Sequence, residues 1–563
     1  MKRNLPVAAI STAALLVTLI CQARPAGAQE MHQHQHDPSE KLGRVSFTVS
    51  CTPAARKQFN RAVAWLHSFE YEEAEKAFKE VAATDPRCGM AHWGVAMSNY
   101  HPLWAPPTAA ELEKGARAVE QAKSVGAGTQ RERDYIAAVE LFYKDADKLG
   151  HRARADAYGE AMGRLSKRYP SDREAEVFYA LALIAKGLGS GDKTYASEKA
   201  AARILNRVLA REPEHPGVTH YLIHGYDYPP LAHMAVAAAR SYAKIAPSSA
   251  HARHMPSHIF TRLGMWQDSI QSNLNSKAAA EAFAVRNRMQ DAWDEKLHAM
   301  DYLAYAYLQG AQDAQARGVL EELNRLRKVE PESFKVAYAA SAIPARYALE
   351  RRRWDEAAKL TLREGLLGNF PWKDFSWAEA HVHFARAVGA ARTGDAAAAR
   401  QEVEKLTATG RALAEIKAGY DWGKQVEIAR QVASAWLAHA EGRREESLRL
   451  MRAAAELDDS TEKHPVTPGA LLPAREQLGE LLLELKEPAA ALREFEASLV
   501  NAPNRFNGLY GAARSAALAG DRKKAEGFYK QLVAQSRHAD ADRPELAEAK
   551  EFLAGGAKTA RNK

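Results

Sequence analysis

The sequence has few cysteines, no long apolar stretch after its first residues and no block of like charge. Three cysteines in 563 residues exclude a small scaffold held together by disulfides. After residue 28 no segment approaches the roughly 18 consecutive apolar residues that a membrane-spanning helix requires, so we expect no membrane span. Basic and acidic residues are interspersed and the formal net charge is only +8, so the sequence does not predict a nucleic-acid-binding surface.

Recognisable catalytic motifs are also missing. The chain contains neither G-x-S-x-G nor H-E-x-x-H. Residues 187–194 resemble a phosphate-binding loop, but Asp192 stands where a glycine is required, and the segment follows a predicted helix instead of a strand. We therefore expect a binding protein, and keep a metal-dependent redox or hydrolytic enzyme as an alternative.

The N-terminus has the three parts of a secretory signal. Lys2 and Arg3 precede an apolar run over residues 7–20, and small residues at 26–28 supply a cleavage site. We predict a signal peptide over residues 1–28 and export to the periplasm or the cell exterior. Residues 29–50, which open with a histidine-rich tract, are predicted to form a flexible tail.

Most of the remaining chain repeats one pattern. Residues 71–86 contain small, aromatic and proline residues at helical spacing, and the pattern returns over 487–503 and 520–529, while Pro213 and Pro247 stand 34 residues apart. This pattern resembles the tetratricopeptide repeat. The resemblance implies an all-α, right-handed superhelix of roughly 11–12 helical hairpins. It also implies a concave groove that binds a peptide or protein partner.

We expect the superhelix to consist of two arms. The N-terminal arm covers residues 51–310 and the C-terminal arm residues 311–553, followed by a disordered tail at 554–563. A proline-rich insertion over residues 101–107 is expected either to connect two helices or to cover one end of the groove, because proline does not continue a helix.

Two of the three cysteines remain after signal cleavage. Cys51 and Cys88 lie just before or at the start of successive first helices of the repeat, and these ends are neighbours in a hairpin stack. Because the expected compartment is oxidising, we predict a disulfide between them. Two buried free thiols are the alternative.

Histidines concentrate in two consecutive repeats. His220 and His224 are four residues apart, and the next repeat carries His251, His254 and His258. Residues at these spacings share one face of a helix. His254 follows His220, and His258 follows His224, by 34 residues, which is the repeat period. The spacing thus predicts a two-by-two histidine patch on the concave surface, with His251 at its edge.

Converging imidazoles are typical ligands for copper, zinc or iron. Further candidates for the site are Asp227, His298, Asp301 and His101. The alternatives are a metal-free groove that binds a peptide and a structural role for the histidines. Pro256 lies between His254 and His258 and predicts a kink or a helix start at that position.

Overall fold

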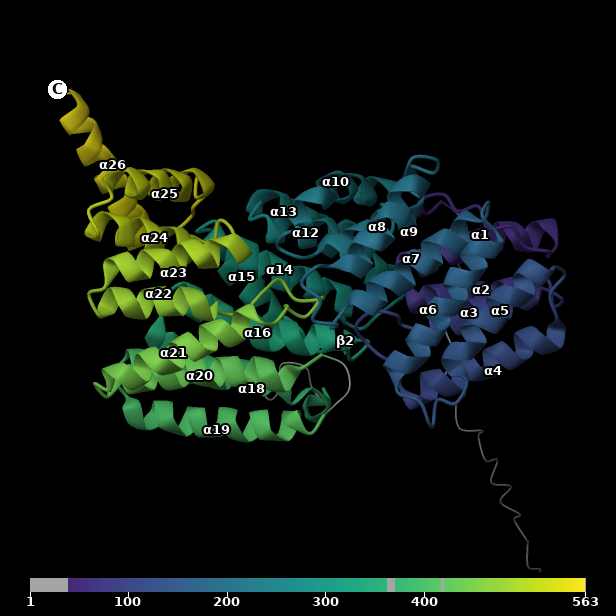
Figure 1. The fold of residues 1–563 in the computed structure, drawn as a ribbon, viewed down its shortest axis with the longest axis horizontal. Helices are drawn as coiled ribbons and strands as arrows, with labels where there is room; N and C mark the ends of the chain where they lie inside the picture. The colour runs from purple at the N-terminus through teal and green to yellow at the C-terminus, as the bar shows by residue number, and fades with distance from the viewer. Residues whose placement is uncertain (1–38, 362–369, 417–419, 562–563) are drawn as a thin grey trace, which may run out of the picture. The chain divides into compact units, whose positions relative to one another are not determined.

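Antiparallel helical hairpins make up nearly all of the computed structural model, which describes residues 39–361, 370–416 and 420–561 (Figure 1). Consecutive helices pack against each other along the chain, and the first helix of one pair packs against the next pair. From α1/α2 to α24/α25 the number of helical pairs agrees with the roughly 11–12 hairpins that the sequence predicts. The all-α, superhelical repeat fold is thereby confirmed.

The helices before the histidine-rich repeats run through α8. They are α1 (Pro53–His67), α2 (Tyr71–Thr84), α3 (Gly89–Ser98), α4 (Ala109–Val125), α5 (Gln130–Tyr143), α6 (His151–Arg168), α7 (Arg173–Gly187) and α8 (Ala196–Leu209).

The helices that carry the histidines follow directly. They are α9 (Pro216–Tyr226), the short 3-10 helix η1 (Ala232–Ala235), α10 (Val236–Ile245), α11 (Ala250–His254), α12 (Pro256–Arg262), α13 (Trp266–Arg286) and α14 (Asp294–Gln309). A single parallel pairing joins β1 (Ala292–Trp293) to β2 (Val329–Glu330), with Ala292 opposite Val329.

The C-terminal helices complete the stack, and Figure 1 shows α18 to α23 lying side by side as successive layers. They are α15 (Asp313–Arg325), α16 (Phe334–Glu350), α17 (Trp354–Ala357), η2 (Trp372–Phe375), α18 (Trp377–Arg392), α19 (Ala396–Ala414), α20 (Trp422–Ala440), α21 (Arg444–Asp459), α22 (Ala474–Glu484), α23 (Pro488–Asn501), α24 (Phe506–Leu518), α25 (Arg522–Gln535) and α26 (Pro544–Arg561).

The repeated aromatic residue packs where the neighbouring helices carry glycine. A side chain at Gly511 would place its Cβ 2.2 Å from the ring of Phe495, which is 1% exposed. The same relationship holds between Gly94 and Phe78. Close helix packing at these points requires the absence of a side chain, which explains why small and aromatic residues alternate at the repeat spacing.

The predicted N-terminal tail is wrong over its second half. Leu42 and Phe47 are buried in the core, and the backbone N–H of Arg44 donates to the carbonyl of Glu214 at 2.9 Å. Apolar residues at alternating positions after Lys41 supply enough buried surface to order this segment. The signal peptide and the histidine-rich residues 29–38 lie outside the described residues.

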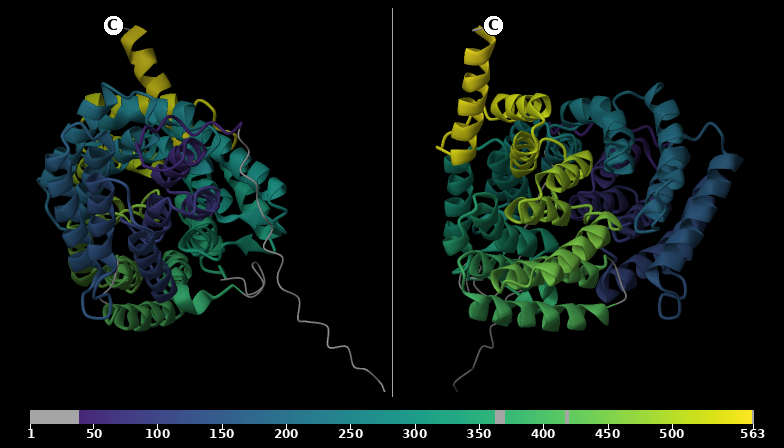
Figure 2. Two further views of the ribbon diagram at one scale, coloured as in Figure 1. Left: turned by 90° about the vertical axis from the view of Figure 1, so that its right-hand side faces the viewer. Right: turned by 60° about the vertical axis from the view of Figure 1, so that its left-hand side comes forward.

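The disordered tail predicted over residues 554–563 overlaps the end of the last helix and stays a prediction. Helix α26 continues to Arg561, and residues 562 and 563 lie outside the description. The helix packs against α25 and then extends beyond the preceding hairpins (Figure 2). Residues 544–555 are rich in alanine, leucine and glutamate, which favour a helix without further contacts.

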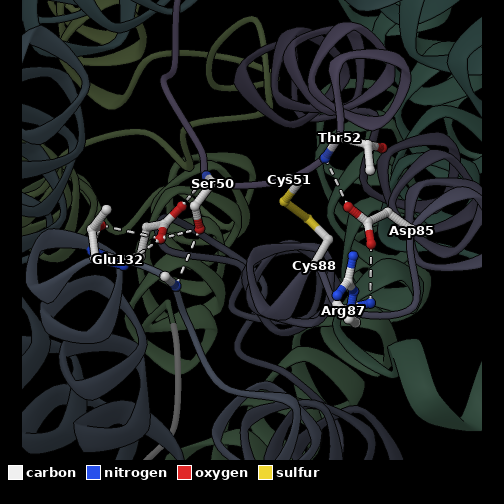
Figure 3. Close-up of a disulfide and its surroundings, with 9 residues drawn as sticks. Ser50, Cys51, Thr52, Asp85, Arg87, Cys88 and Glu132 are labelled. Atoms are coloured by element: carbon white, nitrogen blue, oxygen red, sulfur yellow. Dashed lines mark hydrogen bonds between the residues drawn. A yellow bond between two sulfur atoms is a disulfide. The ribbon is translucent and has the colours of Figure 1, made fainter.

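The predicted disulfide is present between Cys51, which precedes α1, and Cys88, the N-cap of α3 (Figure 3). Next to it, the backbone N–H of Thr52 donates to the carboxylate of Asp85 at 2.8 Å. Within the described ranges, no helix is long and apolar enough to cross a membrane.

Candidate metal centre

Six histidines from three neighbouring hairpins form one buried cluster, which we call the histidine cluster. Its members are between 0% and 7% exposed: His220, His224, His251, His254, His258 and His298. We expected the first five on an open concave groove. The structure instead encloses them, because Phe69 of the turn between α1 and α2, apolar residues of α9 and Tyr302 of α14 pack around them.

The cluster consists of two triads instead of the predicted two-by-two patch. In the first triad, His220, His224 and His251 bring one nitrogen each within 4.8 Å of one another. In the second triad, the same holds for the residues His254, His258 and His298. Helix α11 ends at His254 and α12 begins at Pro256. On α11, His251 faces His220 of α9, whereas His254 packs against His298 of α14.

Nε2 atoms converge within the first triad and between two residues of the second. Nε2 of His220 lies 3.0 Å from Nε2 of His224 and 3.1 Å from Nε2 of His251. In the second triad, Nε2 of His254 lies 3.0 Å from Nε2 of His258. Two nitrogens bound to one ion at about 2.0–2.1 Å lie roughly 2.9 to 3.4 Å apart for right-angled to tetrahedral geometry. The observed separations fit that range.

Acceptors outside the second triad fix the protons of two of its rings. Nδ1–H of His254 donates to Oδ1 of Asn273 at 2.7 Å, and that amide is oriented because its own Nδ2 donates to the carbonyl of Ser269. Nδ1–H of His258 donates to Oδ2 of Asp227 at 3.0 Å. A neutral imidazole carries only one N–H, so both Nε2 atoms present lone pairs.

The first triad contains a similar arrangement. Nδ1–H of His220 donates to the backbone carbonyl of His67 at 2.7 Å, and a carbonyl only accepts. The single lone pair on Nε2 of His220 therefore faces two other imidazole nitrogens. Nδ1 of His251 lies 3.9 Å from a carboxylate oxygen of Glu295.

The rings are neutral. Burial lowers the pKa of His220 to about 3, and burial followed by neighbouring imidazoles lowers the pKa of His224, His251 and His298 well below its usual value. Burial also lowers the pKa of His258, although Asp227 opposes the shift. Burying a charged imidazole in an apolar surrounding costs more than these hydrogen bonds return.

Asp227 is charged and joins the second triad to a distant loop. Burial raises its pKa, but Lys463 and Arg262 outweigh this and hold the pKa well below the usual range. Nζ of Lys463 lies 2.9 Å and Nε of Arg262 lies 2.8 Å from its carboxylate. Lys463 precedes the loop around His464 that departs from the repeat pattern.

Aromatic rings cover the histidine cluster. The ring of Phe69 lies 4.4 Å from His220 and 5.5 Å from His224, between ring centroids. Trp104, from the proline-rich insertion, lies 5.1 Å from His224, so this insertion covers one side of the cluster. Tyr302 of α14 lies 4.6 Å from His254 and its hydroxyl is 3.4 Å from His258.

A third group, His67, Glu174 and His215, lies next to the first triad but has its own hydrogen-bond partners. Nε2 of both histidines faces Glu174 at 2.9 Å, Nδ1 of His67 meets the hydroxyl of Tyr221 at 2.8 Å, and Nδ1 of His215 accepts from the backbone of Val218. Every ring nitrogen is thus satisfied within the protein. This group positions the carbonyl of His67 for His220.

The structure separates the remaining sequence candidates. Asp227 and His298 belong to the cluster or contact it. Asp301 lies instead 4.0 Å from Arg346, and His101 packs against Tyr71 and contacts neither triad. The sequence does not predict four residues around the cluster, because none of them repeats at the 34-residue spacing of the histidines. These residues are Phe69, Asn273, Tyr302 and Lys463.

No protein-family model and no curated protein matches the chain. Among solved structures, it is similar to the human IFIT1 dimer with m7Gppp-AAAA, with 11% identity over 80% of this chain and 90% of that chain and a TM-score of 0.36. A monomeric IFIT1 mutant with Gppp-AAAA shows 12% identity over 86% and 96% of the two chains, with a TM-score of 0.36. The Naa15/Naa10 complex bound to HypK-THB shows 11% identity over 90% and 92%, with a TM-score of 0.26.

Proposed function

We propose that this chain is an exported helical-repeat protein whose histidine cluster binds transition-metal ions. The observation that carries the proposal is the 3.0 Å contact between Nε2 of His254 and Nε2 of His258. Both rings use their only proton at Nδ1, so two lone pairs face each other in a site without water access. A cation between them turns this repulsion into two bonds.

A proton is the other cation that fits between two lone pairs. Burial disfavours added positive charge from either cation, and only a metal ion offsets this cost with bonds to more than two nitrogens. A metal ion gains a third ligand from His298, which a proton cannot use. The Nδ1 partners also agree with a metal site, since metal-bound histidines usually donate their second N–H to a carboxylate, amide or carbonyl.

Peptide recognition by the same histidines is less well supported. A peptide-binding groove requires accessible side chains, whereas His220 and His254 are fully buried and His258 is 2% exposed. Export is supported by the disulfide between Cys51 and Cys88, which is stable in an oxidising compartment.

The test is metal analysis of the full chain with His32, His34 and His36 changed to glutamine, so that the N-terminal tract does not add to the count. The protein is incubated with Zn²⁺ or Cu²⁺, desalted and analysed by mass spectrometry of the elements. We expect at least one ion per chain, and a loss of at least half in His254→Gln/His258→Gln.

The matched control is His233→Gln, since His233 is exposed on η1 near the cluster. It should retain the wild-type metal content. Circular dichroism verifies that each variant is folded. Less than about half an equivalent in the folded wild type with Zn²⁺, with Cu²⁺ and with copper(I) alike would refute the proposal.

A further inference from the structure

The two triads are immediate neighbours. Ring centroids of His224 and His258 lie 6.1 Å apart, and those of His251 and His254 lie 6.3 Å apart. His251 and His254 also belong to the same five-residue helix, α11, yet serve different triads. Two ions bound here would occupy one enclosure and interact electrostatically at short range.

The ligand set of this enclosure carries no charge of its own. All six candidate ligand atoms are imidazole nitrogens, and neither triad includes a carboxylate oxygen. The nearby charges cancel as a set. Arg262 and Lys463 both face Asp227. Lys335 is shared by two carboxylates, with its Nζ 2.6 Å from Glu295 and 3.1 Å from Asp294. Little net negative charge is therefore left to offset two metal ions.

Ion charge then decides which metal pair is tolerated. At equal separation two divalent ions repel each other four times as strongly as two monovalent ions, and the water-poor surroundings screen this repulsion weakly. Among metals that imidazole binds well, copper offers a stable monovalent state. Zinc is divalent only, and non-haem iron sites usually include a carboxylate ligand.

We propose that the histidine cluster holds a pair of copper(I) ions, one in each triad. This inference rests on the proposed function and adds to it the number, identity and charge of the ions. His220, His224 and His251 bind the first ion, and the residues of the second triad bind the other. Three ligands and the aromatic cover of Phe69, Trp104 and Tyr302 suit an ion of low coordination number in a dry site.

The experiment compares copper(I) and zinc(II) binding by the full chain with the three N-terminal histidines changed to glutamine as above. Copper(I) is titrated without oxygen against a chromophoric copper(I) chelator, and zinc against a chromophoric zinc chelator. We expect two equivalents of copper(I) and at most one tightly held equivalent of zinc. The second zinc ion should bind at least 100-fold more weakly than the first.

Single variants assign the two ions. His251→Gln in the first triad and His298→Gln in the second should each retain one equivalent of copper(I), and the double variant none. His233→Gln should retain two. If a variant does not fold, the comparison of copper(I) with zinc in the wild type still decides the question.

The outcomes separate the two proposals. Metal-free protein under all conditions would overturn the proposed function and this inference together. One equivalent of copper(I), or two equivalents of zinc of similar affinity, would overturn the copper(I) pair alone and leave a metal-binding histidine cluster.

Discussion

The carboxylate of Asp227 accepts a hydrogen bond from Nδ1 of His258 at 3.0 Å, although the two residues lie in different repeats. This contact determines which nitrogen of His258 carries the proton and directs Nε2 toward His254. It also connects the cluster to Lys463, more than two hundred residues further along the chain. The orientation of the second triad therefore depends on the C-terminal half of the superhelix.

Asp227→Asn should weaken metal binding by about 10- to 100-fold, the usual effect of removing a carboxylate behind a ligating histidine. An asparagine still accepts from Nδ1 of His258, but it no longer raises the basicity of that ring. Competition with a chelator gives the affinity. Asp421→Asn, at the exposed start of α20, is the control and should leave it unchanged. An Asp227→Asn protein that is folded and binds metal with unchanged affinity would contradict this role.

The Cys51–Cys88 disulfide closes a loop with a sequence separation of 37 residues. Constraining a loop of this length in the unfolded chain stabilises the fold by about 3–4 kcal/mol. Cys51→Ser/Cys88→Ser should lower the free energy of unfolding by that amount in denaturant titrations. Neither sulfur contacts the histidine cluster, so the metal content of the folded variant should not change. A variant as stable as the oxidised wild type would argue against the disulfide in the native protein.

Acid should destabilise the fold partly through His464, which is 4% exposed. Burial, followed by Lys463, lowers its pKa to about 3 in the folded protein from an ordinary value of 6.5. At a pH between about 3 and 6.5, the unfolded chain binds a proton at His464 that the native chain lacks. Stability therefore rises with pH across this window and is lost as the pH falls, by up to about 1.4 kcal/mol per pH unit.

His464→Gln should remove this contribution. Denaturant unfolding of metal-free protein between pH 6.5 and pH 4 is expected to show a shallower loss of stability in the variant than in the wild type. The exposed His233→Gln is the control and should follow the wild-type slope. If the stability of His464→Gln and of the wild type changed with pH at the same slope, His464 would have the same pKa in the folded and the unfolded chain.

The 34-residue spacing predicts which helices carry the histidines, but not how the histidines group into two triads. His220 and His224 lie on one face of α9, as four-residue spacing requires. His254 and His258 are also in contact, although α11 ends and α12 begins between them. Between repeats, His224 and His258 are neighbours, as the 34-residue spacing predicts, with ring centroids 6.1 Å apart. The spacing does not predict that His251 joins His220 and His224, or that His298 joins His254 and His258. The sequence predicts the interruption at Pro256, but which triad His251 joins depends on tertiary packing.

The sequence marks His298 only as a secondary candidate because the repeat loses its 34-residue period before this histidine. Helix α13 extends to Arg286, and β1 lies between it and α14, so His298 stands 40 residues after His258. Lys463 and Asn273 have no periodic relation to the histidines at all. Hydrogen bonds to ligand-positioning residues form between segments whose proximity follows from the whole superhelix, and a local pattern does not encode them.

A substitution at Gly217 tests whether the position of His67 is needed to orient the first triad. A Cβ at Gly217 would lie 2.6 Å from Nδ1 of His67, whose backbone carbonyl orients His220. Gly217→Ala should therefore displace His67, lower the free energy of unfolding by about 1–3 kcal/mol through overpacking, and weaken metal binding.

Gly225→Ala is a matched control on the same helix, where the new Cβ would meet Ile184 at an ordinary 3.5 Å. It should be neutral or stabilising by up to about 1 kcal/mol, because alanine favours a helix over glycine. Thermal unfolding and chelator competition on both variants measure the two effects. If Gly217→Ala were as stable and bound metal as tightly as Gly225→Ala, the cluster would tolerate movement of His67, and the hydrogen bond from His220 to its carbonyl would not be needed to position the first triad.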